Sequence, residues 1–517
     1  MRPNSRTERV ALGAAAGLLS AAAGVGVSAL VAAGLDGAPT PITAVGSRVI
    51  DATPGSLKDW AIRTLGTNDK PFLLAGIYST LALIACLTGI VAWRSRTTAL
   101  ALTGLLGVVG ILAAAKDPTQ LVGPVARVTP GVAALLVSVG MLAWFTHRWS
   151  ATSAVPAPPA SAPDGFDRRA FLAAAVVSGA VATTGFEVSR RLGKAGAESR
   201  AGIRLPRPQT PARPLAARTS LGVAGVTPFI TRAADFYRVD TALSVPQIDA
   251  GSWRLRIHGM VEDEIELTFE DLLGMPLIER RVTLTCVSNE VGGPYISTAT
   301  WLGVRFSDLL DSLGVSADAD AVKSTSADGF TVGTPLSALT DGRDAMVAVG
   351  MNGSPLPLER GFPARMIVPG LYGYVSATKW LVDLEVTTFA DFSAYWTDRG
   401  WDAQAPIKTA SRIDVPGSFA QLEAGTVPIG GIAWAQHTGI AKVEVNIDGG
   451  PWHEATLGAE DTVDTWRQWV YPWHATPGSH TIQARATDRS GYTQTSERAA
   501  PRPNGATGWQ SVVVTVT

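Results

Sequence analysis

The sequence predicts a multi-domain fold: an N-terminal α-helical transmembrane bundle, an α+β domain in the middle and a C-terminal immunoglobulin-like β-sandwich. Three observations lead to this prediction. Apolar runs near the length of a bilayer-spanning helix are confined to the first 190 residues. Short strands and helices alternate irregularly over the middle of the chain, and short alternating strands with turn signals fill the C-terminal part.

Five apolar runs in the N-terminal region approach the length needed to cross a bilayer. They are Val10–Leu35, Phe72–Trp93, Leu100–Ala115, Val132–Phe145 and Ala170–Phe186. With the N-terminus inside, five spans place every basic cluster that flanks these runs in the cytoplasm, as the positive-inside rule requires. The pattern therefore predicts a multi-pass protein of the cell membrane whose chain beyond the fifth span is extracytoplasmic.

Paired arginines precede the last apolar run, in the sequence DRRAFLAAAVVSGAVATTGF. Arg168 and Arg169, followed by one residue and then Phe-Leu and an apolar stretch, resemble a twin-arginine export signal. The alternative is an ordinary basic flank on a helix. The preceding ATSAVPAPPASAPDG is rich in Pro, Ala and Ser, which predicts a disordered linker.

Changes in composition divide the chain into five segments. Residues 1–150 form a transmembrane region of about four helices, and residues 151–200 carry the linker, the twin-arginine-like motif and a fifth helix. A second linker, rich in Pro and Arg, occupies residues 201–227. Residues 228–400 are expected to form the catalytic domain and residues 401–517 the immunoglobulin-like domain.

Local patterns place strands and helices in the two soluble domains. RLRIHGMV alternates like a strand, LTFEDLLGM begins a helix behind a threonine, and TWLGVRFSDLLDSLGV predicts a strand and then a helix behind Ser307. No glycine fingerprint follows a strand, so a nicotinamide-binding fold is not expected. Val443, Val445 and Ile447 alternate with polar residues before a turn, and HTIQARATDRSG and WQSVVVTVT repeat this pattern.

Net charge and cysteine content narrow the possible functions. The formal net charge of -1 provides no basic surface for nucleic acid. Of the two cysteines, Cys86 lies within an apolar run and Cys286 within the soluble stretch RVTLTCVSNEVGG, so a disulfide between them is not expected. A lone thiol is a small buried hydrophobe, a nucleophile or a metal ligand, and composition alone favours the first.

Three segments resemble the sulfite oxidase family, which includes the assimilatory nitrate reductases of plants and bacterial exported methionine-sulfoxide reductases. They are FYRVDTALSVPQID at 236–249, TLTCVSNEVGG with STATWLGVRFSDLL at 283–310, and MNGSPLPLERGFPARMIVPGLYGYVSATKWL at 351–381. The resemblance implies an α+β molybdopterin domain of the sulfite oxidase type. The following sandwich is similar to the family's dimerisation domain, which implies a homodimer.

The resemblance implies Mo-molybdopterin as cofactor, with the metal bound by one cysteine thiolate and by the pterin dithiolene. Cys286 stands at the metal-ligand position, and a thiolate suits this soft-ligand site. The phosphate end of the pterin needs cations and hydrogen-bond donors. The matching cofactor-binding residues are Tyr237, Arg238, Cys286, Asp328, Arg360, Arg365, Ala377, Thr378 and Lys379; Cys286 and Arg238 are the implied catalytic residues.

Three positions depart from the family pattern. Arg360 stands where sulfite oxidases carry a histidine and the bacterial sulfoxide reductases an asparagine. Sulfite oxidases have an arginine five residues after the ligand cysteine, but here this residue is Val291, after Glu290. Trp401 replaces the tyrosine of the substrate pocket. An apolar side chain beside a carboxylate does not favour a dianion, so the reaction class is better supported than the substrate.

The sequence therefore predicts an oxidoreductase that moves an oxygen atom and two electrons at molybdenum, with sulfite-like oxidation first and reduction of an S- or N-oxide as the alternative. A catalytically silent, surface-anchored binding module is the rival from another class. No CxxCH haem motif is present, and the predicted helices offer only His147, at a helix end. A separate electron-transfer partner, either a cytochrome or a quinone-linked protein, is therefore expected, with a small oxyanion or S/N-oxide as substrate.

Overall fold

The computed structural model describes residues 6–35, 37–54, 57, 60, 64–65, 68–150, 168–192 and 194–517. The chain forms two compact units. The first comprises Met1–Gly196 and Thr241–Gln247, and the second comprises Ala197–Asp240 and Ile248–Thr517. The linker predicted at residues 151–165 lies outside the described residues.

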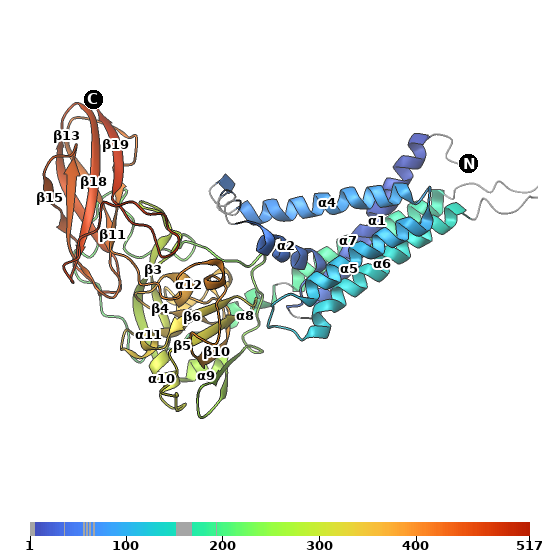
Figure 1. Ribbon diagram of the computed structural model, residues 1–517, viewed down its shortest axis with the longest axis horizontal. Coiled ribbons are helices and arrows are strands. Elements are labelled where there is room, and N and C mark those ends of the chain that lie inside the picture. Colours follow the sequence, from blue (N-terminus) through green and yellow to red (C-terminus); the bar gives the residue numbers. More distant parts are fainter. Residues whose placement is uncertain are drawn as a thin grey trace, which may run out of the picture. The chain divides into compact units, whose positions relative to one another are not determined.

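The first unit is helical (Figure 1). Its helices are α1 (Arg6–Ala33), α2 (Pro41–Ala52), α4 (Asp69–Val91), α5 (Arg96–Ala115), α6 (Pro124–Ser150) and α7 (Arg168–Leu192), and α8 (Ala195–Gly202) follows. Four of the described helices are long and apolar enough to cross a membrane: α1, α4, α5 and residues Pro124–His147 of α6. The fifth predicted run lies in α7, where the apolar stretch among the described residues is the shorter segment Ala175–Gly185.

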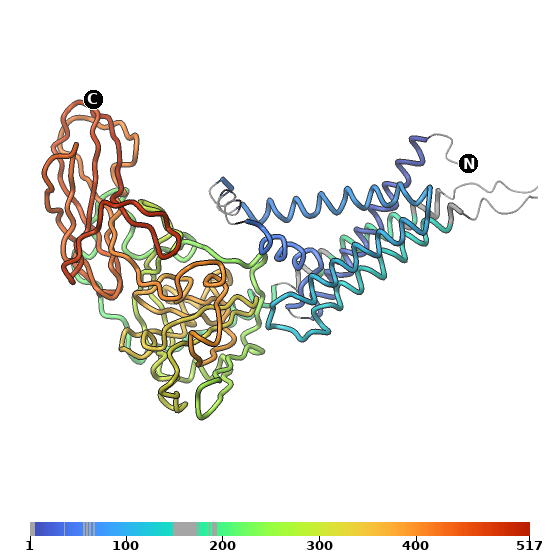
Figure 2. The backbone as a smooth tube through the Cα atoms, viewed as in Figure 1, coloured from blue at the N-terminus to red at the C-terminus, as the bar shows by residue number. Residues whose placement is uncertain are grey.

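Small residues let the helices of this unit approach closely. A Cβ on Gly13 of α1 would come within 2.8 Å of the Gly89 carbonyl oxygen of α4, and one on Gly17 would overlap the Ala85 backbone. Gly26 of α1 approaches Ala182 of α7 in the same way, at 2.6 Å. Glycine and alanine at helix contacts are characteristic of helices that associate in lipid. Figure 2 shows α5 and α6 lying side by side, in agreement with their mutual contacts.

Hydropathy does not reveal α2, because its twelve residues are too few to cross a bilayer. The local sequence explains the helix. The Thr40 side chain caps its N-terminus by accepting a hydrogen bond from the Thr43 backbone N–H at 3.2 Å, and Pro41 occupies the first turn. Proline is favoured there because its missing N–H would have no partner within the helix.

The α+β domain is built on two sheets. One has the order β2 (Ile265–Thr268), β1 (Arg254–Gly259), β10 (Leu381–Thr387), β5 (Ala321–Ser326), β6 (Thr331–Pro335). The other has the order β3 (Leu277–Thr285), β4 (Ile296–Arg305), β7 (Met346–Met351), β8 (Ser354–Pro355), with β9 (Arg365–Ile367) also paired to β7. Short helical segments connect them: α9 (Phe269–Gly274), α10 (Phe306–Leu310), α11 (Ser337–Thr340), η2 (Leu358–Arg360), α12 (Gly373–Ser376) and η3 (Thr397–Arg399).

The helix starts of this domain test the local predictions. Thr268 caps α9 and forms a reciprocal capping box with Asp271, as the sequence predicts. The prediction that Ser307 precedes the next helix is wrong, because α10 begins at Phe306 and therefore contains Ser307. Its N-cap residue is Arg305, whose side chain makes no capping hydrogen bond. Phe306 is fully buried, so its packing rather than a hydroxyl cap sets the helix start.

The C-terminal region contains two further sheets (Figure 1). Their strand orders are β11 (Ala410–Val415), β13 (Gly425–Trp434), β17 (Arg467–Ala475), β16 (Thr456–Leu457) and β12 (Gln421–Leu422), β19 (Gln510–Val516), β18 (Gly478–Asp488), β14 (Ile440–Ile447), β15 (Trp452–Glu454). Residues of both sheets share one hydrophobic core. Val443 and Val445 are fully buried in it, so the predicted alternation along β14 has the expected inward face.

The segment predicted as a second linker packs along the edge of β3. The Gln209 N–H donates to the Leu277 carbonyl at 2.8 Å, and the Glu279 N–H donates to the Thr210 carbonyl at 2.9 Å. Farther along, the Leu221 N–H donates to the side-chain oxygen of Gln468. Residues 203–227 are therefore without helix or strand but are held to the second unit by backbone hydrogen bonds.

Candidate functional site

Cys286 stands directly after β3, where pairing with β4 ends. Its backbone N–H donates to the Tyr295 carbonyl at 3.0 Å, and its carbonyl accepts from the Asn289 N–H, which closes a tight turn. The thiol lies 2.9 Å from the Ser288 hydroxyl. Burial raises the pKa of Cys286, while the Ser288 hydrogen bonds and the Lys379 charge oppose this rise. A positive metal ion at this thiol would stabilise the thiolate that burial disfavours.

Arg360 and Arg365 lie near this thiol, both with only 5% exposure. The Arg360 guanidinium donates to three backbone carbonyls, the shortest bond being 2.7 Å to Tyr237. Arg365 donates to the Arg360 carbonyl at 3.0 Å and the Ala377 carbonyl at 3.1 Å, and its guanidinium faces the Trp301 ring. Burial lowers the pKa of Arg360 and lowers that of Arg365 to about 10.

Lys379 and Arg238 converge on one buried carboxylate. Asp240, with 4% of its side chain exposed, accepts from Lys379 Nζ at 2.9 Å and from Arg238 Nε at 2.7 Å. Burial lowers the pKa of Lys379 to about 8 against the opposing attraction of Asp240. A Cβ on Gly361 would come within 3.0 Å of Lys379 and 3.1 Å of the Arg365 side chain, so this glycine, at φ +107°, lets the two cations approach.

The remaining predicted site residues surround these cations. Tyr237 is close enough to Cys286, Arg360 and Arg365 for their charges to affect its pKa, which burial raises strongly. Asp328 interacts with Asp240 and Lys379, and burial raises its pKa. Ala377 contributes a carbonyl to Arg365, and Thr378 is buried and bonded to Ser324. The structure therefore brings all nine predicted residues into one cluster.

We call Arg238, Arg360, Arg365, Lys379 and Asp240 the cationic cradle. Among the described residues, the ion pairs of its four cations are those to Asp240, and neither Arg360 nor Arg365 forms a salt bridge. Buried cations without balancing carboxylates are costly unless an anion neutralises them. The donor set therefore fits an anionic group such as the phosphate of a pterin, next to a thiol that can bind a soft metal.

Residues of the C-terminal region bind β3 through a salt bridge and hydrogen bonds. Arg281 forms a buried two-point salt bridge with Asp461, at 2.7 and 2.8 Å. The Thr283 N–H donates to the Asp464 carbonyl, and Gln436 donates from its side-chain amide to Thr285 Oγ1 at 2.9 Å. The strand that ends at Cys286 is therefore fixed by side chains from outside the α+β domain.

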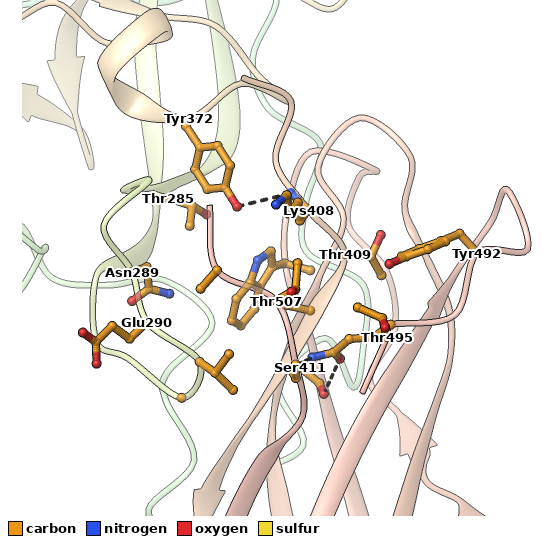
Figure 3. A pocket seen from close by; sticks show the side chains of 17 residues that line it. Thr285, Asn289, Glu290, Tyr372, Lys408, Thr409, Ser411, Tyr492, Thr495 and Thr507 are labelled. Carbon is orange, nitrogen blue, oxygen red and sulfur yellow. Dashed lines mark hydrogen bonds between the residues drawn. The ribbon is translucent and has the colours of Figure 1, made fainter. Parts of the chain in front are cut away.

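A recess of about 500 Å³, including its open mouth, lies next to the turn that follows Cys286 (Figure 3). Both domains of the second unit line it. The α+β domain contributes the turn after Cys286 together with Tyr372, and the C-terminal region contributes three further segments. Its lining residues are Thr285, Asn289, Glu290, Val291, Gly292, Tyr372, Lys408, Thr409, Ala410, Ser411, Trp434, Tyr492, Gln494, Thr495, Ala506, Thr507 and Gly508.

Trp401, expected to replace the pocket tyrosine, is not among the residues that line the recess. Its ring instead packs 5.8 Å from that of Tyr374 and 6.3 Å from that of Trp396. Glu290 and Val291, by contrast, border the recess as their spacing from Cys286 predicts.

Sequence reasoning missed two residues with prominent positions. Asp240 binds two cations of the cradle, and Tyr372 places its phenol in the recess. Asp240 lies in the same FYRVD stretch that suggested Tyr237, and a carboxylate two residues after an arginine was a signal for an ion pair. Tyr372 lies within the third family-like segment, but no local pattern distinguishes a pocket tyrosine from a core tyrosine.

Comparisons with known proteins agree with this geometry. Residues 242–396 match the family described as oxidoreductase molybdopterin binding domain. The mitochondrial sulfite oxidase of Mus musculus is 32% identical over 276 residues, which are 44% of this chain and 50% of that protein. The chain thus spans about half the length of such curated relatives. The uncharacterized oxidoreductase YuiH of Bacillus subtilis (strain 168) is 31% identical over 153 residues, 30% of this chain and 74% of that protein.

Among solved structures, the chain resembles the sulfane dehydrogenase SoxCD from Paracoccus pantotrophus. The similarity has a TM-score of 0.50 at 23% sequence identity and covers 56% of this chain and 84% of that chain. At this identity the match concerns the fold, which extends over more of the chain than residues 242–396.

Proposed function

This chain belongs to the sulfite oxidase family of molybdopterin-dependent oxidoreductases, and we propose that it transfers an oxygen atom and two electrons at a molybdenum centre bound by Cys286. The observation that carries the proposal is the cationic cradle beside a lone thiol at the end of β3. A catalytically silent module would have no need for four converging cations, two of them without a salt bridge in the described part of the chain.

Each residue of the cradle has a role in this proposal. Arg365 and Lys379 would bind the anionic end of the cofactor, with Asp240 keeping Lys379 and Arg238 in place. Arg360 already donates to the carbonyls around Tyr237, so its part is to hold the 233–237 segment against the site. Tyr237, Asp328, Ala377 and Thr378 complete the walls. When bound, the molybdenum centre supplies the two-electron redox couple; the protein binds, orients and shields it.

Sulfite-like oxidation remains the first reaction that we propose, because the resemblance to sulfite oxidases implies it. Reduction of an S- or N-oxide is a second candidate that one observation favours. Beside Cys286 the recess presents Glu290 and Val291, and its only lining cation among the described residues is Lys408. The Lys408 ammonium donates to Asn504 Oδ1 at 2.8 Å and to the Gly505 carbonyl at 2.7 Å, which leaves one of its three N–H donors for an anion.

Elemental analysis of the purified full-length chain tests the proposal. About one molybdenum per chain is expected, together with either sulfite-dependent reduction of ferricyanide or oxide-dependent oxidation of a reduced viologen dye. A chain that binds no molybdenum when produced in a cofactor-competent host would support the silent binding module instead.

We also propose that the helical unit anchors the catalytic domain at the outer face of the cytoplasmic membrane, following export by the twin-arginine route. That route carries folded proteins, which suits a domain loaded with its cofactor in the cytoplasm. The double variant Arg168→Lys with Arg169→Lys should leave the second unit protected from protease added to spheroplasts. Digestion equal to that of the wild type would contradict the export proposal.

Two partner proposals accompany this arrangement. A separate cytochrome or quinone-linked protein would accept or supply the electrons, and the C-terminal sheets, proposed as an immunoglobulin-like dimerisation domain, would pair two chains. Sedimentation of the detergent-solubilised chain measures the second; a monomer at micromolar concentration would contradict it.

A further inference from the structure

The Tyr372 phenol lies in the recess, and its hydroxyl is only partly hydrogen-bonded by the described residues. The side chain is only 4% exposed, and its hydroxyl points along the recess toward Lys408 (Figure 3). The hydroxyl oxygen accepts a long hydrogen bond, 3.4 Å, from the Lys408 backbone N–H. Within the described residues no acceptor is recorded for the phenol's own proton. A buried donor without an acceptor costs free energy, and such groups call for an explanation.

The backbone around Tyr372 is held firmly, so this orientation is built into the fold. The Tyr372 N–H donates to the Ala405 carbonyl at 2.9 Å, and its carbonyl accepts from Val375 at the start of α12. On the other side of the ring, a Cβ on Gly505 would overlap the phenol, so only glycine fits against it. The ring therefore has little freedom to move toward a different acceptor.

The phenol is also close to the proposed metal ligand. Tyr372 and Thr285, the residue before Cys286, line the same recess, and the charge of the Cys286 thiolate reaches Tyr372. Burial, together with that charge, raises the pKa of Tyr372 to about 12. The phenol is thus protonated, and a donor, throughout the physiological pH range.

We propose that Tyr372 is a substrate-binding residue whose hydroxyl donates a hydrogen bond to the oxygen of a small S–O or N–O compound held beside Cys286. This inference depends on the proposed function, since it presupposes a metal at Cys286. Trp401, which stands where the resemblance implies a pocket tyrosine, packs against Tyr374 and is not among the residues that line the recess.

The test compares Tyr372→Phe with Tyr374→Phe in the full-length, molybdenum-loaded protein in detergent. Tyr374 is a matched control, because its hydroxyl donates to the Asp402 carbonyl at 2.6 Å and its ring does not line the recess. Loss of one neutral hydrogen bond should lower kcat/KM roughly two- to tenfold in Tyr372→Phe, chiefly through KM, with molybdenum content and Tm unchanged. Tyr374→Phe should keep the wild-type kcat/KM.

Two assays separate the substrate classes: sulfite with ferricyanide, and dimethyl sulfoxide or trimethylamine N-oxide with a reduced viologen. If the wild type turns over none of them, binding of sulfate and dimethyl sulfoxide is followed by the visible absorption of the metal centre, with the same two- to tenfold loss expected. A wild type without molybdenum overturns the proposed function. A loaded wild type that binds neither probe, or a Tyr372→Phe variant with wild-type affinity, overturns this inference alone.

Discussion

The cationic cradle and the recess both lie near Cys286 and differ in almost every physical respect. The cradle contains four cations and one buried carboxylate, which pairs with two of them, within the α+β domain. The recess is lined largely by hydroxyl, amide and apolar groups that come from both the α+β domain and the C-terminal region. The cradle suits a large, charged, fixed ligand, whereas the recess suits a small molecule held by neutral hydrogen bonds.

This difference teaches which part of the site constrains the sequence. A buried anion requires cations at fixed positions, and these residues keep their family-like sequence context from Tyr237 to Lys379. A recess that binds by single neutral hydrogen bonds can change its donors one at a time, at roughly 1 kcal/mol each. The departure at Val291 lies in the recess and exchanges a cation for an apolar side chain, whereas the departure at Arg360 lies in the cradle and still supplies a cation.

The largest effect is expected from removing the proposed metal ligand, which lies near both regions. Cys286→Ser should abolish molybdenum binding, because a serine alkoxide replaces a thiolate poorly at a soft metal. Metal content by elemental analysis is the measurement, with Cys86→Ser as the matched control, since that thiol lies in α4 of the other unit. Equal molybdenum in wild type and Cys286→Ser would refute the ligand assignment.

The next effect probes the attachment of β3 to the C-terminal region. Arg281→Met leaves Asp461 buried without its partner, and breaking a buried pair from one side costs about 3 kcal/mol. Chemical denaturation should show this loss as a lower unfolding midpoint. The exposed pair Arg256–Glu264 supplies the control, since Arg256→Met should leave the unfolding midpoint nearly unchanged. Equal losses in the two variants would mean that this attachment does not stabilise the site.

The sequence predicts those helices and strands whose pattern lies in consecutive residues better than those that depend on tertiary packing. Four of the five predicted apolar runs form long helices, and period-two alternation predicts β14, because both patterns depend on consecutive residues. The helix start at Phe306 and the short helix α2 escape prediction, since tertiary packing and a single cap decide them. Hydropathy also cannot show that residues 203–227 pack along β3.

The residues of the site likewise differ in whether the local sequence predicts them. Cys286, Arg365 and Lys379 could be proposed because whole segments around them resemble a family. Asp240 could have been proposed from its neighbours but was not. Tyr372 and the segments of the C-terminal region that line the recess are brought near Cys286 only by the tertiary fold. No spacing in the sequence predicts that these residues lie close together.

A third prediction concerns a substitution that adds a cation to the recess. Val291→Arg adds a cation beside Cys286, and a charged hydrogen bond to an anion is worth about 1.5–3 kcal/mol. Sulfite affinity should therefore rise roughly ten- to a hundredfold. Glu290 can pair with the new guanidinium, so the double variant with Glu290→Gln should show the larger gain. The measurement is the sulfite KM with ferricyanide; a micromolar KM in the wild type would show that another cation already serves this purpose.

The last prediction concerns how the unfolding free energy depends on pH when no anion is bound in the cradle. Burial lowers the pKa of Lys379 from 10.5 to about 8, so between these values the unfolded chain binds a proton that the folded chain does not. The unfolding free energy of the cofactor-free protein therefore rises with pH from about 8 to 10.5, and below pH 8 this contribution to the slope vanishes. The lowering from 10.5 to about 8 already includes the attraction of Asp240, and it corresponds to a gain on the order of 3 kcal/mol. Denaturation at pH 7.5 and pH 10 measures it, and the difference between wild type and Lys379→Met isolates it from other titrating groups. A wild-type chain with the same pH dependence as Lys379→Met would show that Lys379 keeps an ordinary pKa, in which case the cradle is not short of negative charge and the argument for a bound anion loses its electrostatic basis.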